Sequence, residues 1–152
     1  MYRNRGSAEI NIHEIRNVKP FTPDQQCLIQ GGRSFYIGNY GHHNPTPVFI
    51  KKIEQTPNER NAIMRECKNH SKLSNPNIIE FIGYFFEGNT VNIVTKRADC
   101  SLNKYLIDHP ELSISQRKYI LYSVAYGLVY LKWNNVSHHD LKVMNVPHFV
   151  IQ

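Results

Sequence analysis

The 152-residue chain lacks an apolar run long enough to cross a membrane, and it has no internal repeat, low-complexity tract or block of like charge. Its most apolar window, residues 119–131, is shorter than the roughly 20 residues that a membrane-spanning helix needs. The first six residues are polar and no apolar stretch follows them, so we expect no secretory signal peptide. We therefore expect a soluble protein with no membrane partner.

Cysteine is scarce as well. Cys27, Cys67 and Cys100 are odd in number and contain no C-x-x-C spacing, so they do not predict a disulfide framework. Reduced thiols of this kind are typical of proteins inside the cell, and we expect a cytoplasmic location (the host cytoplasm, if the chain is viral).

Composition is that of a globular domain, with 41% hydrophobic and 20% charged residues. The net charge of +6 permits acidic partners, but the basic residues are scattered instead of gathered into one stripe. A basic nucleic-acid-binding domain is one alternative, although no recognised module of that class is present.

The N-terminal half predicts strands around one helix. Residues 1–26 are polar and favour an extended arm; residues 35–37 and 48–50 are β-prone runs separated by a turn-rich segment at 41–45. Strands are also expected over 78–86 and 91–95, joined by a short hairpin.

The helix between these strand pairs has a clear start. Thr56 is the expected N-cap, Pro57 takes the first helical position and Glu59 completes a capping box. The helix is expected to end at residues 74–77. Its apolar face is predicted to contain Ile63, Cys67, His70 and Leu73.

The C-terminal half predicts helices. Ser101 caps a short helix that stops at His109, and Ser113 with Gln116 forms a capping box for a helix reaching about Lys132. One face of the long helix is predicted to carry Ile114, Leu121, Val124, Ala125 and Leu128. A stripe beside it, interpreted as packing surface, carries Tyr119, Tyr122, Tyr126 and Tyr130. This order of elements predicts an α+β fold with two lobes.

Three separated features suggest chemistry. Residues 48–51 read V-F-I-K and end in Lys51, Glu66 lies fifteen residues further on the capped helix, and residues 138–145 follow the pattern H-x-D-L-K-x-x-N. In this order they resemble the protein-kinase superfamily. Residues 36–38 read Y-I-G, which is similar to the sequence that ends that family's second strand.

The resemblance implies an N-terminal arm over 1–24 and a truncated kinase-like domain over 25–152. This domain would comprise an N-lobe over 25–96, an antiparallel sheet plus one helix, and the beginning of a helical C-lobe over 97–152.

It also implies roles for individual residues. Lys51, paired with Glu66, would hold the phosphates of ATP; Asp140 would accept the proton of a substrate hydroxyl and Lys142 would lie near the transferred phosphate. Asn145 would hold a Mg²⁺ ion. The remaining nucleotide-binding residues would be Gly31, Gly32 and Thr95, with a hinge at 96–98.

The chain also departs from the family pattern. Leu28, Gln30 and Arg33 stand where the three phosphate-loop glycines are expected, and Gly31 and Gly32 are out of register. His139 replaces the usual arginine. A D-F-G motif, expected about a dozen residues after Asn145, does not occur before Gln152. These departures predict a catalytically inactive, kinase-like protein.

Residues 12–15, 36–40 and 74–78 are similar to the pseudokinase domain of mixed-lineage kinase domain-like proteins. That similarity implies a decoy or regulator that binds a signalling kinase or its substrate, and inhibition of necroptosis by sequestering a receptor-interacting kinase. An ATP-dependent Ser/Thr kinase, or a fragment of one, is the main alternative. Other interpretations are an ordinary surface pair for Lys51 and Glu66 and a metal cluster at residues 138–140.

Overall fold

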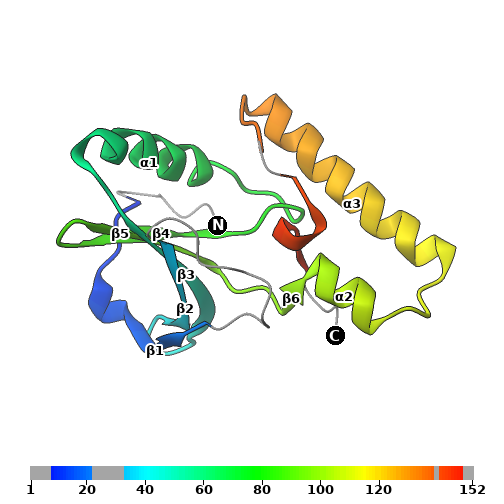
Figure 1. Ribbon diagram of the computed structural model, residues 1–152, viewed down its shortest axis with the longest axis horizontal. Helices are drawn as coiled ribbons and strands as arrows, with labels where there is room; N and C mark the ends of the chain where they lie inside the picture. Colours follow the sequence, from blue (N-terminus) through cyan, green and yellow to red (C-terminus); the bar gives the residue numbers. More distant parts are fainter. Residues whose placement is uncertain (1–7, 22–32, 139–140, 149–152) are drawn as a thin grey trace. The chain divides into compact units, whose positions relative to one another are not determined.

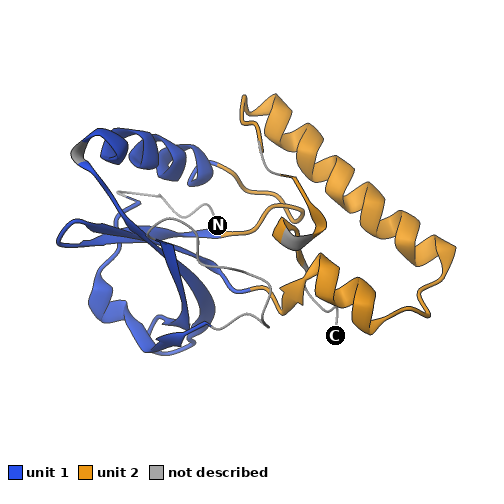
Figure 2. Cartoon of the chain, in the orientation of Figure 1, with its two compact units in different colours: residues 1–72, 81–97 blue, residues 73–80, 98–152 orange. Residues whose placement is uncertain are grey.

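The computed structural model describes residues 8–21, 33–138 and 141–148, and divides the chain into two compact units (Figures 1 and 2). Unit 1 contains residues 1–72 and 81–97, and unit 2 contains residues 73–80 and 98–152. No helix in the described ranges is long and apolar enough to cross a membrane.

Unit 1 is a five-stranded antiparallel sheet with one helix, which confirms the predicted α+β class (Figure 1). The strand order is β1-β2-β3-β5-β4. Its elements are η1 (Ile12–Glu14), β1 (Ile15–Pro20), β2 (Arg33–Tyr40), β3 (Thr46–Glu54), α1 (Pro57–His70), β4 (Phe81–Glu87) and β5 (Thr90–Lys96).

The two faces of this sheet carry separate hydrophobic clusters because side chains alternate along each strand. One face packs against α1, and its buried residues are Cys67, Phe81, Tyr84, Val91 and Ile93. The opposite face is covered by residues of the N-terminal arm, Ile10 and Ile15, and its buried residues are Val48, Ile50, Phe85 and Val94. The arm is therefore part of unit 1's core.

Gly83 lets the arm cross β4. A Cβ atom at this position would overlap Ile10 Cγ2 and would lie 2.7 Å from the carbonyl oxygen of Ala8, well inside normal contact distances. The Ile10 amide donates to the Tyr84 carbonyl at 2.9 Å, and the Tyr84 amide donates to the Ala8 carbonyl at 3.0 Å. The arm therefore adds backbone hydrogen bonds at the β4 edge before it forms β1 at the other edge.

Unit 2 consists of helices and a small two-stranded sheet that the sequence did not predict. Its elements are β6 (Cys100–Ser101), α2 (Leu102–Asp108), α3 (Ile114–Trp133), η2 (Val143–Asn145) and β7 (Pro147–His148). β6 pairs antiparallel with β7, so the end of the described chain returns to the start of α2.

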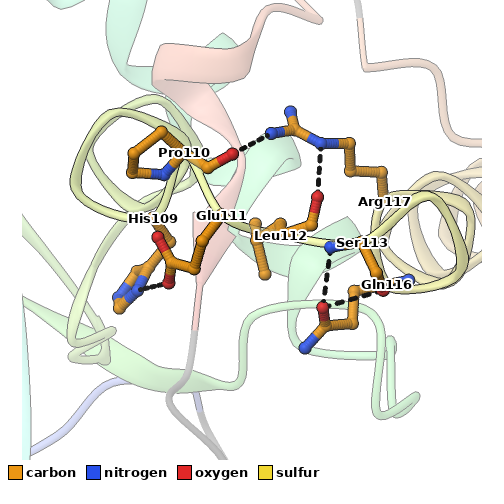
Figure 3. Close-up of polar contacts among 7 residues, drawn as sticks. All are labelled: His109, Pro110, Glu111, Leu112, Ser113, Gln116 and Arg117. Carbon is orange, nitrogen blue, oxygen red and sulfur yellow. Dashed lines mark hydrogen bonds and ion pairs between the residues drawn. The ribbon is translucent and has the colours of Figure 1, made fainter.

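The turn between α2 and α3 is tightly hydrogen-bonded (Figure 3). The Ser113 amide donates to Gln116 Oε1 at 2.9 Å, and the Gln116 amide donates to Ser113 Oγ at 3.3 Å, which confirms the predicted capping box. Arg117 donates from Nε to the Leu112 carbonyl at 3.0 Å and from Nη2 to the Pro110 carbonyl at 2.9 Å. The guanidinium therefore satisfies carbonyls that the turn leaves without a backbone partner.

Two predicted helix faces need correction. α1 ends at His70, so Leu73 lies beyond the helix and is buried in unit 2 instead. On α3, Ile114 and Leu121 are 73% and 66% exposed, whereas the buried residues of that helix are Gly127 and Leu131. The α3 sequence is apolar around most of its circumference, so periodicity alone did not identify its inner face.

Candidate functional site

Lys51 lies in β3, in the middle of the sheet. Its neighbours in the register are Phe35 on β2 and Ile93 on β5, and its side chain is half-buried. Residues directly opposite each other in antiparallel strands share a face. Lys51 therefore lies on the face that α1 covers, beside the side chain of Ile93.

Glu66 is positioned by α1. The helix starts at the predicted cap, where Glu59 Oε2 accepts hydrogen bonds from the Thr56 amide at 2.9 Å and from the Thr56 hydroxyl at 2.7 Å. These bonds lower the pKa of the Glu59 carboxyl. Nearly three turns later, Cys67 is 1% exposed and packs into the core, whereas Glu66 is exposed.

Lys51 and Glu66 are not joined by an ion pair; among the described residues the ion pairs involve other side chains. Both charges nevertheless act on the thiol of Cys67, the residue that follows Glu66. Burial, and after it the Glu66 carboxylate, raises the pKa of Cys67 to about 11, and the Lys51 ammonium opposes the rise. The nucleotide-holding roles of Lys51 and Glu66 stay predictions.

Thr95 lies near the end of β5, opposite Phe49 on β3 and Phe81 on β4. Its side chain is half-buried. The following residues leave the sheet, and the Arg97 amide donates to the Pro47 carbonyl at 2.9 Å. The division between units 1 and 2 falls directly after Arg97, inside the segment predicted as a hinge.

Sequence reasoning missed an aromatic cluster on the face that carries Lys51. The Phe49 ring stacks on Phe35, with centroids 5.6 Å apart and planes inclined by 25°, and it meets Phe21 edge-on at 5.4 Å. One signal was available: Phe49 takes the place of alanine in the V-A-I-K pattern. A methyl group is thus replaced by a ring at this position.

The predicted catalytic segment follows α3 in unit 2. The helix ends at Trp133 and its C-cap is Asn134, whose side-chain Nδ2 donates to the Tyr130 carbonyl at 2.8 Å. Asn135 has a φ of 56°, a left-handed conformation that asparagine tolerates better than most residues, and the Val136 amide returns to the Leu131 carbonyl at 2.9 Å. This C-cap directs the chain away from α3 just before His138.

Lys142 is the N-cap of the 3₁₀ turn η2 and Asn145 is its last residue, and both are exposed. The Asn145 amide donates to the Lys142 carbonyl at 2.8 Å, and the Leu102 amide at the start of α2 donates to the Val146 carbonyl, also at 2.8 Å. These bonds and the β6–β7 pairing attach the segment to α2.

Three predicted site residues, Asp140, Gly31 and Gly32, lie outside the described residues, as does His139. Lys51, Glu66 and Thr95 belong to unit 1, and Lys142 and Asn145 belong to unit 2. Within the described ranges, no three His, Cys, Asp or Glu side chains are grouped so that they could hold a metal ion.

Comparison with known proteins agrees with the fold. Residues 32–147 match the family described as protein tyrosine and serine/threonine kinase. A relative from Acanthamoeba polyphaga mimivirus, a putative serine/threonine-protein kinase, is 36% identical over 149 residues, which cover 92% of this chain and 28% of the relative. Mouse dual specificity testis-specific protein kinase 1 is 28% identical over 125 residues, covering 80% of this chain and 20% of the relative.

The Drosophila melanogaster serine/threonine-protein kinase polo is 29% identical over 103 residues, covering 65% of this chain and 17% of the relative. The chain thus spans less than a third of the length of each of these relatives. These comparisons do not show the similarity to mixed-lineage kinase domain-like proteins, which stays a prediction. The matched range, the α+β sheet with its single helix and the relatives agree on one conclusion: the chain belongs to the protein tyrosine and serine/threonine kinase family.

Proposed function

We propose that this chain is a kinase-like module that acts by binding a signalling kinase or its substrate, and does not itself transfer phosphate. The observation that carries the proposal is the absence of an ion pair between Lys51 and Glu66 in the described part of the chain. Phosphoryl transfer in this family depends on positioned charges, and it requires the strand lysine and the helix glutamate to be paired.

The packing of α1 explains the absence. Cys67, together with Ile63 and Met64, forms the side of α1 that packs on the sheet, so the neighbouring Glu66 is exposed. The orientation of α1 that buries these contacts is thus one in which Lys51 and Glu66 form no ion pair. The sequence adds a second argument, because Leu28, Gln30 and Arg33 replace the glycines that allow close approach of backbone to phosphate.

A narrower form of the proposal is a decoy that sequesters a receptor-interacting kinase and thereby inhibits necroptosis. It rests on the similarity of residues 36–40 and 74–78 to mixed-lineage kinase domain-like pseudokinases. A protein partner also fits the exposed apolar side chains of α3, which are Ile114, Tyr119, Leu121, Tyr122, Tyr126, Val129 and Trp133. Self-association through the same side chains is the simplest competing use of this surface.

The second candidate is an ATP- and Mg²⁺-dependent Ser/Thr protein kinase, or part of one. The H-x-D-L-K-x-x-N pattern ending at Asn145 favours it, as do relatives named as serine/threonine-protein kinases. In that case Asp140 would be the base, Lys142 would neutralise the transferred phosphate and Asn145 would hold Mg²⁺.

Phosphoryl transfer separates the two candidates. The purified chain is incubated with labelled ATP, Mg²⁺ and generic protein substrates, beside an Asp140→Asn variant prepared in the same way. We expect the same background signal from both proteins. Transfer by the unmodified chain that disappears in Asp140→Asn would be intrinsic, and it would replace our proposal with the kinase candidate.

Binding is tested separately with a purified receptor-interacting kinase domain and, as a control, an unrelated kinase domain. We expect saturable binding to the former that ATP does not change. If the chain binds neither domain, the decoy form of the proposal is wrong. A Tyr126→Lys variant then shows whether α3 contributes, with Asn89→Lys in an exposed turn as the charge-matched control.

A further inference from the structure

Phe49 neighbours both Lys51 and Thr95, two residues that the kinase resemblance assigns to a nucleotide site. It precedes Lys51 by two positions in β3, so the two side chains share a face of the sheet. It also lies directly opposite Thr95 in the β3–β5 register. A molecule that reached from Lys51 to Thr95 along this face would lie against Phe49 on one side and Ile93 on the other.

The Phe49 ring is held there by rings from the two neighbouring segments. Phe35 on β2 stacks nearly parallel to it, and Phe21, directly after β1, meets its edge. The Phe21 amide donates to the Phe35 carbonyl at 2.9 Å, which continues the β1–β2 hydrogen bonding to this point. Three rings from adjacent segments thus form one aromatic cluster within unit 1.

The cluster supplies what a planar base would need from this face. Offset stacking between flat rings is favourable, and a base stacked on an aromatic side chain gains affinity for the same reason. Phe35 is such a platform, and Phe49 already covers it. The alanine of the V-A-I-K pattern would leave the platform open.

We infer that Phe49, held between Phe35 and Phe21, takes the place of a purine base, so that the chain closes its own nucleotide site. This inference rests on the proposed function and gives it a mechanism, because a site filled by Phe49 binds no ATP even where Lys51 is available for phosphate. The inference concerns only the binding of the base. Contacts to the phosphates, and the general attraction of this basic chain for anions, contribute separately to the binding of ATP.

Adenosine is the probe that isolates the base, because it carries no phosphate. We expect no adenosine binding by the unmodified chain at millimolar concentration, measured by NMR titration. Phe49→Ala uncovers the Phe35 platform and should bind adenosine about tenfold or more tightly than the unmodified chain. Adding Lys51→Met to Phe49→Ala should weaken the binding of ATP and leave that of adenosine unchanged.

Ile53→Ala is the matched control. Ile53 lies two residues beyond Lys51 on the same strand and face. It packs against the hydrophobic core under α1, which contains Cys67 and Ile93. Its truncation loosens the same strand without uncovering Phe35. Equal adenosine binding by Ile53→Ala and Phe49→Ala would attribute the effect to general loosening and contradict the inference.

Two further measurements decide the case if Phe49→Ala does not fold. Phe49→Val removes the ring with a smaller loss of packing and should bind adenosine in the same way. In the unmodified chain, the NMR signals of the Phe49 ring and its contacts to the Phe35 ring should not change when adenosine is added. A saturable shift of those signals, or folded Phe49 variants that bind no adenosine, would overturn the inference.

The outcomes also separate this inference from the proposed function. Adenosine binding by the unmodified chain without phosphoryl transfer contradicts the closed base site alone. A closed base site together with no binding of any kinase domain contradicts the decoy role alone.

Discussion

Lys52 Nζ lies 3.2 Å from Glu87 Oε2, on the opposite face of the sheet from Lys51. The same carboxylate oxygen accepts a hydrogen bond of 3.1 Å from Asn92 Nδ2, and Asn92 is 2% exposed. Lys52 therefore forms an ion pair, whereas the kinase resemblance assigns the preceding residue, Lys51, to the nucleotide. Because Glu87 contacts both Lys52 and Asn92, we expect its substitution to destabilise the fold more than substitution of Lys52 does.

We predict that Glu87→Ala lowers the free energy of unfolding by about 1–3 kcal/mol, because it leaves the buried Asn92 amide without this acceptor. Lys52→Met removes only a partly exposed ion pair and should cost less than about 1 kcal/mol. Denaturant unfolding of both variants measures the difference, with Glu54→Ala, an exposed carboxylate in the same strand, as the control. Equal losses for Glu87→Ala and Glu54→Ala would contradict the assignment.

Tyr130 differs from the other tyrosines of α3. Its hydroxyl accepts a hydrogen bond of 2.9 Å from the Ser74 amide, whereas Tyr126 is 68% exposed. Tyr130→Phe should therefore reduce the free energy of unfolding by about 1 kcal/mol, and Tyr126→Phe should leave it unchanged. Thermal or denaturant unfolding of both variants measures the difference. Equal losses for Tyr130→Phe and Tyr126→Phe would contradict the distinct role of the Tyr130 hydroxyl.

Gly83→Ala should detach the N-terminal arm from β4, because the added Cβ would overlap Ile10 and the Ala8 carbonyl. The hydrogen bonds between Ile10 and Tyr84 and between Tyr84 and Ala8 would then open. Amide hydrogen exchange is the direct measurement: the Ile10 amide should lose protection in Gly83→Ala and keep it in Asn89→Ala, an exposed turn control. If the Ile10 amide stayed protected in both variants, the arm would have accommodated the added Cβ while still paired with β4, which would contradict the prediction.

The capping box at α3 provides a matched serine pair. Ser113→Ala removes the acceptor of the Gln116 amide and should cost about 1 kcal/mol. Ser115→Ala, two residues later inside the same helix, should be neutral or slightly stabilising, because alanine has the higher helix propensity. Circular dichroism during thermal unfolding follows both, and a loss in Ser115→Ala as large as in Ser113→Ala would contradict the capping role.

The Cys67 thiol should make the free energy of unfolding depend on pH in the alkaline range. Burial raises its pKa from the ordinary value of 9.0 to about 11 in the folded protein, so the folded state holds the thiol proton more tightly than the unfolded chain. The stabilisation is complete below pH 9 and is lost as pH rises toward 11, by up to about 2 kcal/mol. The free energy of unfolding, measured across this range, should fall less steeply in Cys67→Ala. Parallel curves for the two proteins would contradict the buried thiol's role.

Local patterns were sufficient for the starts of the helices. The caps at Thr56, Ser101 and Ser113 are confirmed, since each depends on groups within three residues of one another. The strands around residues 35–37, 48–50 and 91–95 are confirmed too, because short β-prone runs between turn residues leave few other choices. The α+β class follows from these elements in order.

Contacts between distant segments decided the remainder. Which side of α3 is buried depends on Gly127, where a Cβ atom would lie 3.0 Å from the Asn77 carbonyl oxygen, and no pattern within the helix encodes that approach. The small β6–β7 sheet likewise depends on segments more than 40 residues apart. Such pairings carry no local signal because their stabilisation comes from the partner strand.

The candidate site shows the same division. The V-F-I-K pattern was enough to place Lys51 on a strand, and the capping box at Thr56 was enough to place Glu66 on a helix, since both depend on local sequence. Whether the two charges meet depends on how α1 is rotated about its own axis. Burial of Ile63, Met64 and Cys67 sets that rotation, because apolar area removed from water outweighs one exposed ion pair, and it leaves Glu66 exposed.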